Sequence, residues 1–91
     1  MINFDDELLR QAIQEFGSDK QALVAVEELS ELQKEILKSV NRRQNNREHI
    51  KEELVDCLIM LRQLIIIYGF TLNELDEIAR AKLERLRGYL K

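Results

Sequence analysis

Two pairs of acidic residues stand out because each falls within an otherwise leucine-rich helical pattern. Glu28 and Glu31 lie in the segment EELSE, and Glu53 and Asp56 lie in the segment ELVD. Residues three apart on a helix lie one above the other on the same face, so the carboxylates of each pair repel unless a cation lies between them. This spacing indicates a divalent cation held by carboxylate oxygens.

The acids fall where apolar residues are expected. At about 100° of rotation per residue, Glu53 lies inside the apolar stripe of its helix and Asp56 lies at the edge of that stripe. In the earlier segment, apolar residues bracket Glu28 and Glu35, and Glu31 lies at the border. Acidic side chains are almost never fully buried unless they are paired or bind a metal.

Two other interpretations of these acids stay open. They can form a solvated acidic face, or they can pair with bases such as Lys82 or Arg85. Four or five converging acids would still leave excess negative charge, which favours a hard cation. Mg²⁺, with Mn²⁺ as a substitute, suits helix-borne carboxylates better than Ca²⁺ does, because Ca²⁺ favours a flexible loop with backbone carbonyls. Iron is disfavoured, because di-iron bundles use Glu-x-x-His pairs that this chain lacks.

The elements that must position these acids are helices. The apolar spacing predicts four of them, over about Phe4–Phe16, Ser18–Val40, Glu48–Tyr68 and Thr71–Gly88. Gly17 and Gly69 are placed to end the first and third helices. Ser18 with Gln21, and Thr71 with Glu74, have the form of capping boxes.

Composition bounds the classes of protein that remain. The 91 residues predict one domain, 1–91, and 45% hydrophobic residues without any proline are typical of an all-α bundle. A net charge of −3 argues against a nucleic-acid binder. Cys57 and His49 are each the only residue of their type, which excludes a disulfide scaffold and a Cys/His zinc site. With no signal pattern and no apolar run of membrane-spanning length, we expect a cytoplasmic protein without membrane contacts.

The segment Leu58–Tyr68 is apolar nearly all round, which predicts burial on more than one side. A chain of this length hardly buries such a helix alone, so we expect the segment to form part of a subunit interface as well as the core. The alternative is that the first and last helices cover it completely within one chain.

The acids and their surroundings together resemble a known family. Glu27-Glu28-x-x-Glu31, 21 intervening residues and Glu53-x-x-Asp56 are similar to the EExxE…ExxD signature of the MazG-like all-α nucleoside triphosphate pyrophosphatases, in particular the small phage and bacterial members. The segments AVEELSEL, KEELVDCLIMLRQL and KLERLR extend the resemblance over nearly the whole chain from about Phe16. Arg80 departs from the family pattern, because many members have asparagine there.

The resemblance implies a fold, a reaction and a set of site residues. The fold is a four-helix bundle completed by assembly into a homodimer or a tetramer. The reaction is Mg²⁺-dependent hydrolysis of a nucleoside triphosphate to the monophosphate and pyrophosphate, with nucleotide-pool house-cleaning as a family-level role. The metal ligands correspond to Glu28, Glu31, Glu53 and Asp56. Lys82, and with it Arg85, corresponds to residues near the substrate phosphates.

Two further residues have competing interpretations. Glu35 lies one turn beyond Glu31, where it can orient a water as a base or remain an outer or solvated acid. Gln21 shares a stripe with Glu28, so a contact with the base or sugar of the substrate competes with its capping role.

Two rival functions also remain at this stage. One is a non-enzymatic helical module that dimerises through the third helix. The other is a carboxylate-bridged metal protein of different chemistry, which the missing histidines disfavour.

Overall fold

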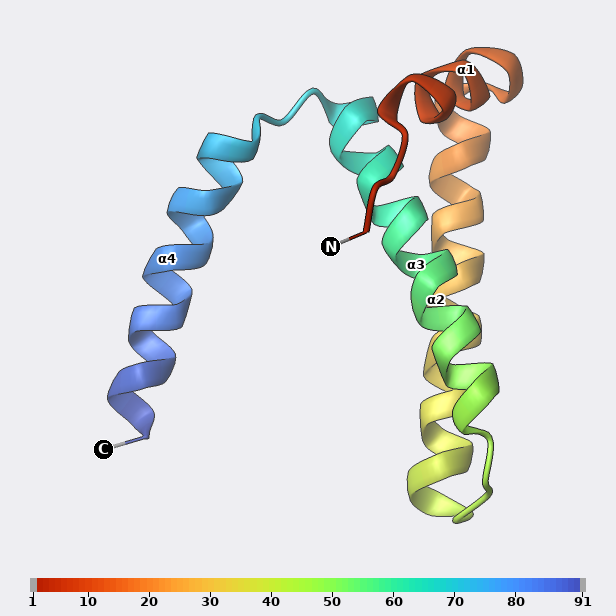
Figure 1. Ribbon diagram of the computed structural model, residues 1–91, viewed down its shortest axis with the longest axis vertical. Helices are drawn as coiled ribbons and strands as arrows, with labels where there is room; N and C mark the ends of the chain where they lie inside the picture. Colours follow the sequence, from red (N-terminus) through yellow and green to blue (C-terminus); the bar gives the residue numbers. More distant parts are fainter. Residues whose placement is uncertain (1, 91) are drawn as a thin grey trace.

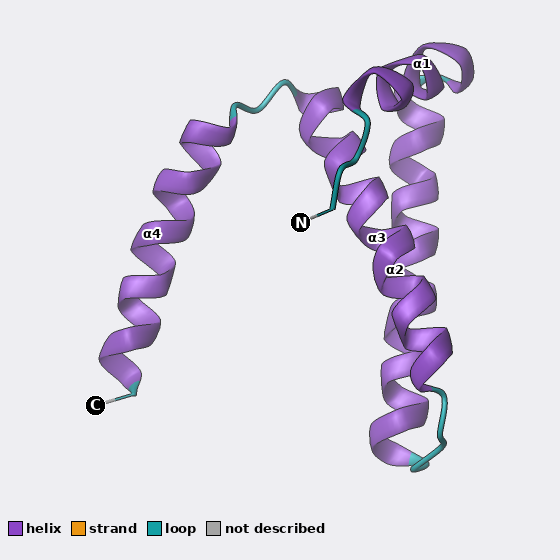
Figure 2. Ribbon diagram, viewed as in Figure 1, coloured by secondary structure: helices purple, strands orange, loops and turns teal. Residues whose placement is uncertain are grey.

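The computed structural model describes residues 2–90, and these form four α-helices and no strand. The helices are α1 (Asp6–Phe16), α2 (Ser18–Asn41), α3 (Arg47–Tyr68) and α4 (Leu72–Tyr89) (Figure 1). Short loops and turns connect them (Figure 2). The expected all-α class and the order of four helices are confirmed, with bounds within two residues of those expected from the sequence.

Local chemistry explains most of the helix ends. Asp5 caps α1, because its side chain accepts a hydrogen bond from the Leu8 amide at 3.3 Å. Gly69 has a φ of 71° and ends α3 in the left-handed region, which favours glycine. Thr71 and Glu74 form the predicted capping box at the start of α4. The Ser18 capping box is wrong, because Gly17 is the N-cap of α2 and Ser18 is already helical.

The core lies between α2 and α3, which run side by side as an antiparallel hairpin (Figure 1). Among residues 2–90, few apolar side chains are buried: Leu9 from α1, Ala25 from α2, and Cys57 and Met60 from α3. Helix α1 packs across one end of the hairpin and contacts both helices. Arg62 of α3 fastens α1 by a two-pronged salt bridge to Asp6, with N–O distances of 2.6 and 2.9 Å.

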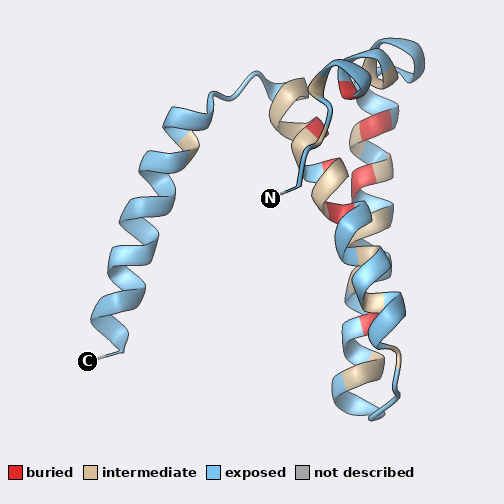
Figure 3. Ribbon diagram, in the orientation of Figure 1, coloured by how far each residue is buried: buried red, intermediate tan, exposed pale blue. Residues whose placement is uncertain are grey.

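Helix α4 stands apart from this unit. It packs against none of the other three helices, and almost all of it is exposed (Figure 3). The radius of gyration is 15.8 Å, compared with about 12 Å for a compact domain of this length. Within the described residues, the four helices therefore form a covered hairpin with a projecting arm, and they do not close into a bundle in a single chain.

Candidate metal centre

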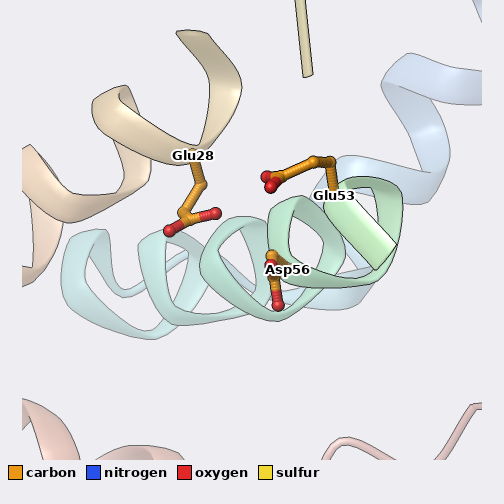
Figure 4. Close-up of side chains that lie close together, drawn as sticks. All are labelled: Glu28, Glu53 and Asp56. Carbon is orange, nitrogen blue, oxygen red and sulfur yellow. The ribbon is translucent and has the colours of Figure 1, made fainter. Parts of the chain in front are cut away.

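Three of the acids singled out in the sequence converge between α2 and α3. Glu28, Glu53 and Asp56 each offer a carboxylate oxygen, and these oxygens lie within 4.8 Å of one another. The Glu28 and Glu53 carboxylates turn toward each other from the two helices, with Asp56 one turn beyond Glu53 (Figure 4). We call these three residues the acidic cluster.

Small residues allow the two helices to approach closely at this point. Ala25 is 1% exposed and Cys57 is 2% exposed, and each lies within one turn of a cluster acid. The Cys57 thiol donates a hydrogen bond to the backbone carbonyl of Glu28, with an S–O distance of 3.2 Å. Burial and then the nearby carboxylates raise the pKa of this thiol, so Cys57 is a neutral core residue.

Glu53 carries the least favourable electrostatics of the cluster. Burial raises the pKa of its carboxyl, and so do the charges of Glu28, Asp56 and Glu31. One oxygen, Oε2, is buried without a hydrogen-bond partner. Among the described residues, no lysine or arginine forms a salt bridge with Glu53, so the cluster has no protein cation to balance its charge.

Glu31, the fourth acid that the resemblance implies as a metal ligand, lies at the border of the cluster. It is exposed and pairs with Lys34 at 3.7 Å. It is close enough to Glu53 to raise the pKa of that carboxyl, but it is not among the three acids whose oxygens converge.

Glu35 is held within the protein by neighbouring side chains. It is buried, at 8% exposure, and it anchors the loop between α2 and α3. Its Oε1 accepts a hydrogen bond from Asn46 Nδ2 at 3.0 Å, and its Oε2 accepts one from Lys38 Nζ at 3.0 Å. His49 Nδ1 lies 3.5 Å from Oε1. Glu35 is therefore not a solvated acid, and both of its carboxylate oxygens already accept hydrogen bonds.

The hydrogen bonds to the Glu35 carboxylate predict that the stability of the fold depends on pH. The hydrogen bonds from Asn46 and Lys38 hold the pKa of Glu35 below its ordinary value of 4.5. A depressed carboxyl pKa stabilises the fold above the unfolded-state value, and this contribution disappears as the pH falls through the folded-state value. Glu35→Gln should therefore lower Tm by several degrees at pH 7 and by progressively less toward pH 3. Thermal melts of both proteins across this range measure it, and an equal deficit at both ends would contradict the anchor.

Gln21 also has a structural role. It is buried on α2, and its Nε2 donates a hydrogen bond of 2.8 Å to Oε1 of Gln63 on α3. This side chain does not cap α2, so the capping interpretation is wrong. A contact of Gln21 with the base or sugar of the substrate stays a prediction. The buried amide pair stabilises this register of the hairpin, because each amide would be left unsatisfied if the helices slipped.

Lys82 and Arg85 lie on α4, away from the acids of the same chain. Two other arginines of α4 pair locally, Arg80 with Asp76 and Arg87 with Glu84, whereas Lys82 and Arg85 form no salt bridge with any described residue. The ion pair between Glu53 and these bases, which the sequence left open, is therefore not formed within the chain.

Asn46 is the residue around the site that the sequence did not indicate. It immediately precedes α3, and asparagine in that position is a recognised helix-start signal. Its side chain instead bonds to Glu35, eleven residues earlier. Only the register of the hairpin brings these two residues together, and sequence spacing alone does not give that register.

Comparison with known proteins finds no match among protein-family models, curated proteins or solved structures. None of the described helices is by itself long and apolar enough to span a membrane. Only α3 and α4 taken together meet that criterion, with a bend of 119° between them.

Proposed function

We propose that this protein is a Mg²⁺-dependent nucleoside triphosphate pyrophosphohydrolase that converts a nucleoside or deoxynucleoside triphosphate to the monophosphate and pyrophosphate. The observation that carries the proposal is the acidic cluster, in which three carboxylates converge around an unpaired buried oxygen of Glu53. The resemblance of the acid pairs to the MazG-like signature supports the same reaction. We further propose that the enzyme acts in the cytoplasm, where it hydrolyses members of the nucleotide pool.

The residues of the cluster fit a magnesium ion. All their donors are carboxylate oxygens, which Mg²⁺ prefers, and Mn²⁺ accepts the same ligands. Glu28, Glu53 and Asp56 would hold the metal, and Glu31 lies at the edge, where it can join them. Burial and then the neighbouring carboxylates raise the pKa of Glu53, and a divalent cation would supply the counter-charge that these carboxylates lack.

The chemistry asks the protein mainly for position and charge. A bound divalent cation neutralises phosphate charge and lowers the pKa of an attacking water. The half-buried Glu28 and Glu53 fix the inner side of the site, whereas the exposed Asp56 lies where a triphosphate can approach from solvent. We assign no base role to Glu35, because its carboxylate is already bonded.

A homo-oligomer, most simply a dimer, completes the proposal. The chain exposes 7598 Å², about 2,000 Å² more than the roughly 5,500 Å² expected of a compact monomer of this mass. Two apolar grooves account for part of this surface. One, of about 650 Å³, includes Leu58, Leu61 and Ile65, and the other, of about 510 Å³, includes Val26 and Leu64. An excess of this size in each chain matches the interface of an obligate dimer.

Helix α4, like the two apolar grooves, has no partner among the described residues of its own chain. Several large apolar side chains of α4 are exposed: Leu72, Ile78, Leu83 and Leu86. We propose that α4 docks within the oligomer and that Lys82 and Arg85 then contact the substrate phosphates.

Thermal melting with and without metal tests the metal site. A ligand that binds only the folded protein stabilises it, so Mg²⁺ or Mn²⁺ at 100 times its Kd should add about 2.7 kcal/mol, a rise in Tm of roughly 10 °C or more. Asp56→Asn should abolish most of this rise. Glu77→Gln, which neutralises an exposed acid on α4, should retain it. Equal metal responses in both variants would contradict the assignment.

A second candidate function is a helical dimerisation module without catalysis. The large exposed apolar surface favours it, since that surface needs a partner whether or not the acids bind metal. A module of this kind would melt at the same temperature with and without divalent cations.

A further inference from the structure

A polar pocket lies where the loop between α2 and α3 meets the two helices. Its volume is about 770 Å³, which is within the range of small-molecule sites. Three consecutive carboxamides of the loop contribute to its lining, Gln44, Asn45 and Asn46, together with Lys38 and His49. We call this the carboxamide pocket.

The carboxamide pocket lies on the same side of the hairpin as the acidic cluster. Glu35, which lines the pocket, follows Glu28 by seven residues on α2, and His49 precedes Asp56 by seven residues on α3. Residues seven apart share a helix face, and seven residues span about 10 Å. A ligand with its phosphates at the cluster would therefore reach the pocket with its other end.

The wall of the pocket is held in place before any ligand binds. Asn46 Nδ2 donates to the backbone carbonyl of Glu35 at 2.8 Å and to its carboxylate at 3.0 Å. Asn46 Oδ1 is buried and has no partner among the described residues.

Apart from Arg47, the charged side chains that line the pocket are already paired within the protein. Lys38 is already neutralised by its bond to Glu35, and Glu48, which also lines the pocket, pairs with Lys51. The carboxamides offer both donors and acceptors, which is the pattern that reads the edge of a nucleobase. The imidazole of His49 and the guanidinium of Arg47 provide planar groups on which a base can stack.

We propose that the carboxamide pocket is the nucleobase subsite, in which Gln44 and Asn45 determine which base is accepted. This inference rests on the proposed function, since it takes the acidic cluster as the phosphate end of the same substrate.

Nuclear magnetic resonance of the backbone amides tests the location without requiring catalysis. The probes are the four deoxynucleoside monophosphates, which carry a base, and inorganic pyrophosphate, which does not, each with Mg²⁺. At least one monophosphate should shift the amides of residues 44–49, and pyrophosphate should not. Monophosphate shifts confined to the neighbourhood of the acidic cluster, or no shifts with any monophosphate, would overturn the subsite.

Kinetics of loop variants test the role in specificity. Gln44→Ala or Asn45→Ala should raise KM for the preferred triphosphate about fivefold or more and flatten the preference among bases. The KM for tripolyphosphate, which has no base, should rise less in the same variants. Asn73→Ala, an exposed asparagine on α4, is the matched control. An unchanged base preference in both loop variants would overturn the role.

The two proposals fail in different ways. If no triphosphate is hydrolysed but a monophosphate shifts the loop amides, the enzymatic function fails and the base site stands. If hydrolysis proceeds without loop shifts, the base site fails and the enzymatic function stands.

Discussion

Glu53→Gln should lower triphosphate hydrolysis by about 100-fold or more. Even the loss of a group that only supports a metal ligand costs roughly 10–100-fold, and Glu53 is a proposed ligand itself. The same change should stabilise the metal-free protein at neutral pH. Glutamine is nearly isosteric, and it removes the carboxylate whose pKa is raised by burial and by Glu28, Asp56 and Glu31. Activity assays and melts in EDTA and in Mg²⁺ give both quantities.

The pH dependence of this effect follows from the direction of the shift. A carboxyl whose pKa is raised on folding opposes folding when it ionises, so this destabilisation sets in as the pH rises through the ordinary value of 4.5. The advantage of Glu53→Gln in EDTA should therefore vanish below that pH and grow toward neutrality. Glu77→Gln, remote from the cluster on α4, should show neither effect. A variant that melts far below wild type in EDTA would indicate that Glu53 holds a buried cation, and the metal assignment would fail.

Leu61→Lys should convert the protein from a dimer to a monomer at micromolar concentration. Leu61 is 41% exposed and lines an apolar groove beside Leu58 and Ile65. In an isolated chain the lysine can reach water, whereas in a dimer it would be an unpaired charge within an apolar contact. Analytical ultracentrifugation of wild type and variant measures the change.

Two comparisons sharpen this experiment. Gln14→Lys adds the same charge at an exposed polar position on α1 and should leave the dimer intact. Ile66→Lys and Ile67→Lys, in the same apolar run, alter side chains that are already half-buried within the chain, so we expect unfolding in addition to dissociation. A wild-type protein that sediments as a folded monomer would contradict the interface.

The sequence predicted the helices well because their ends have local causes. Glycine at positions 17 and 69 and the box of Thr71 with Glu74 act within a few residues, so their effect is visible without tertiary structure. The convergence of Glu53 and Asp56 was likewise predictable, since three-residue spacing alone places them on one helix face.

The contacts across the hairpin were not predictable in the same way. Gln21 meets Gln63 and Glu35 meets Asn46 only in the observed register of α2 against α3. That register depends on packing over the whole length of both helices, so no short motif encodes it. The separation of α4 is also not apparent from the sequence, because an amphipathic helix has the same pattern whether its apolar face meets its own chain or another.

Product analysis tests the central claim most directly. The purified protein is incubated with Mg²⁺ or Mn²⁺ and a panel of canonical and modified nucleoside and deoxynucleoside triphosphates, and the products are separated by chromatography. We predict nucleoside monophosphate and pyrophosphate in equal amounts from at least one substrate, with no cleavage in EDTA and almost none by Asp56→Asn. Nucleoside diphosphate and orthophosphate would show that the terminal phosphate is removed instead, which contradicts the proposed reaction. If no triphosphate in the panel is cleaved, the enzymatic function is contradicted.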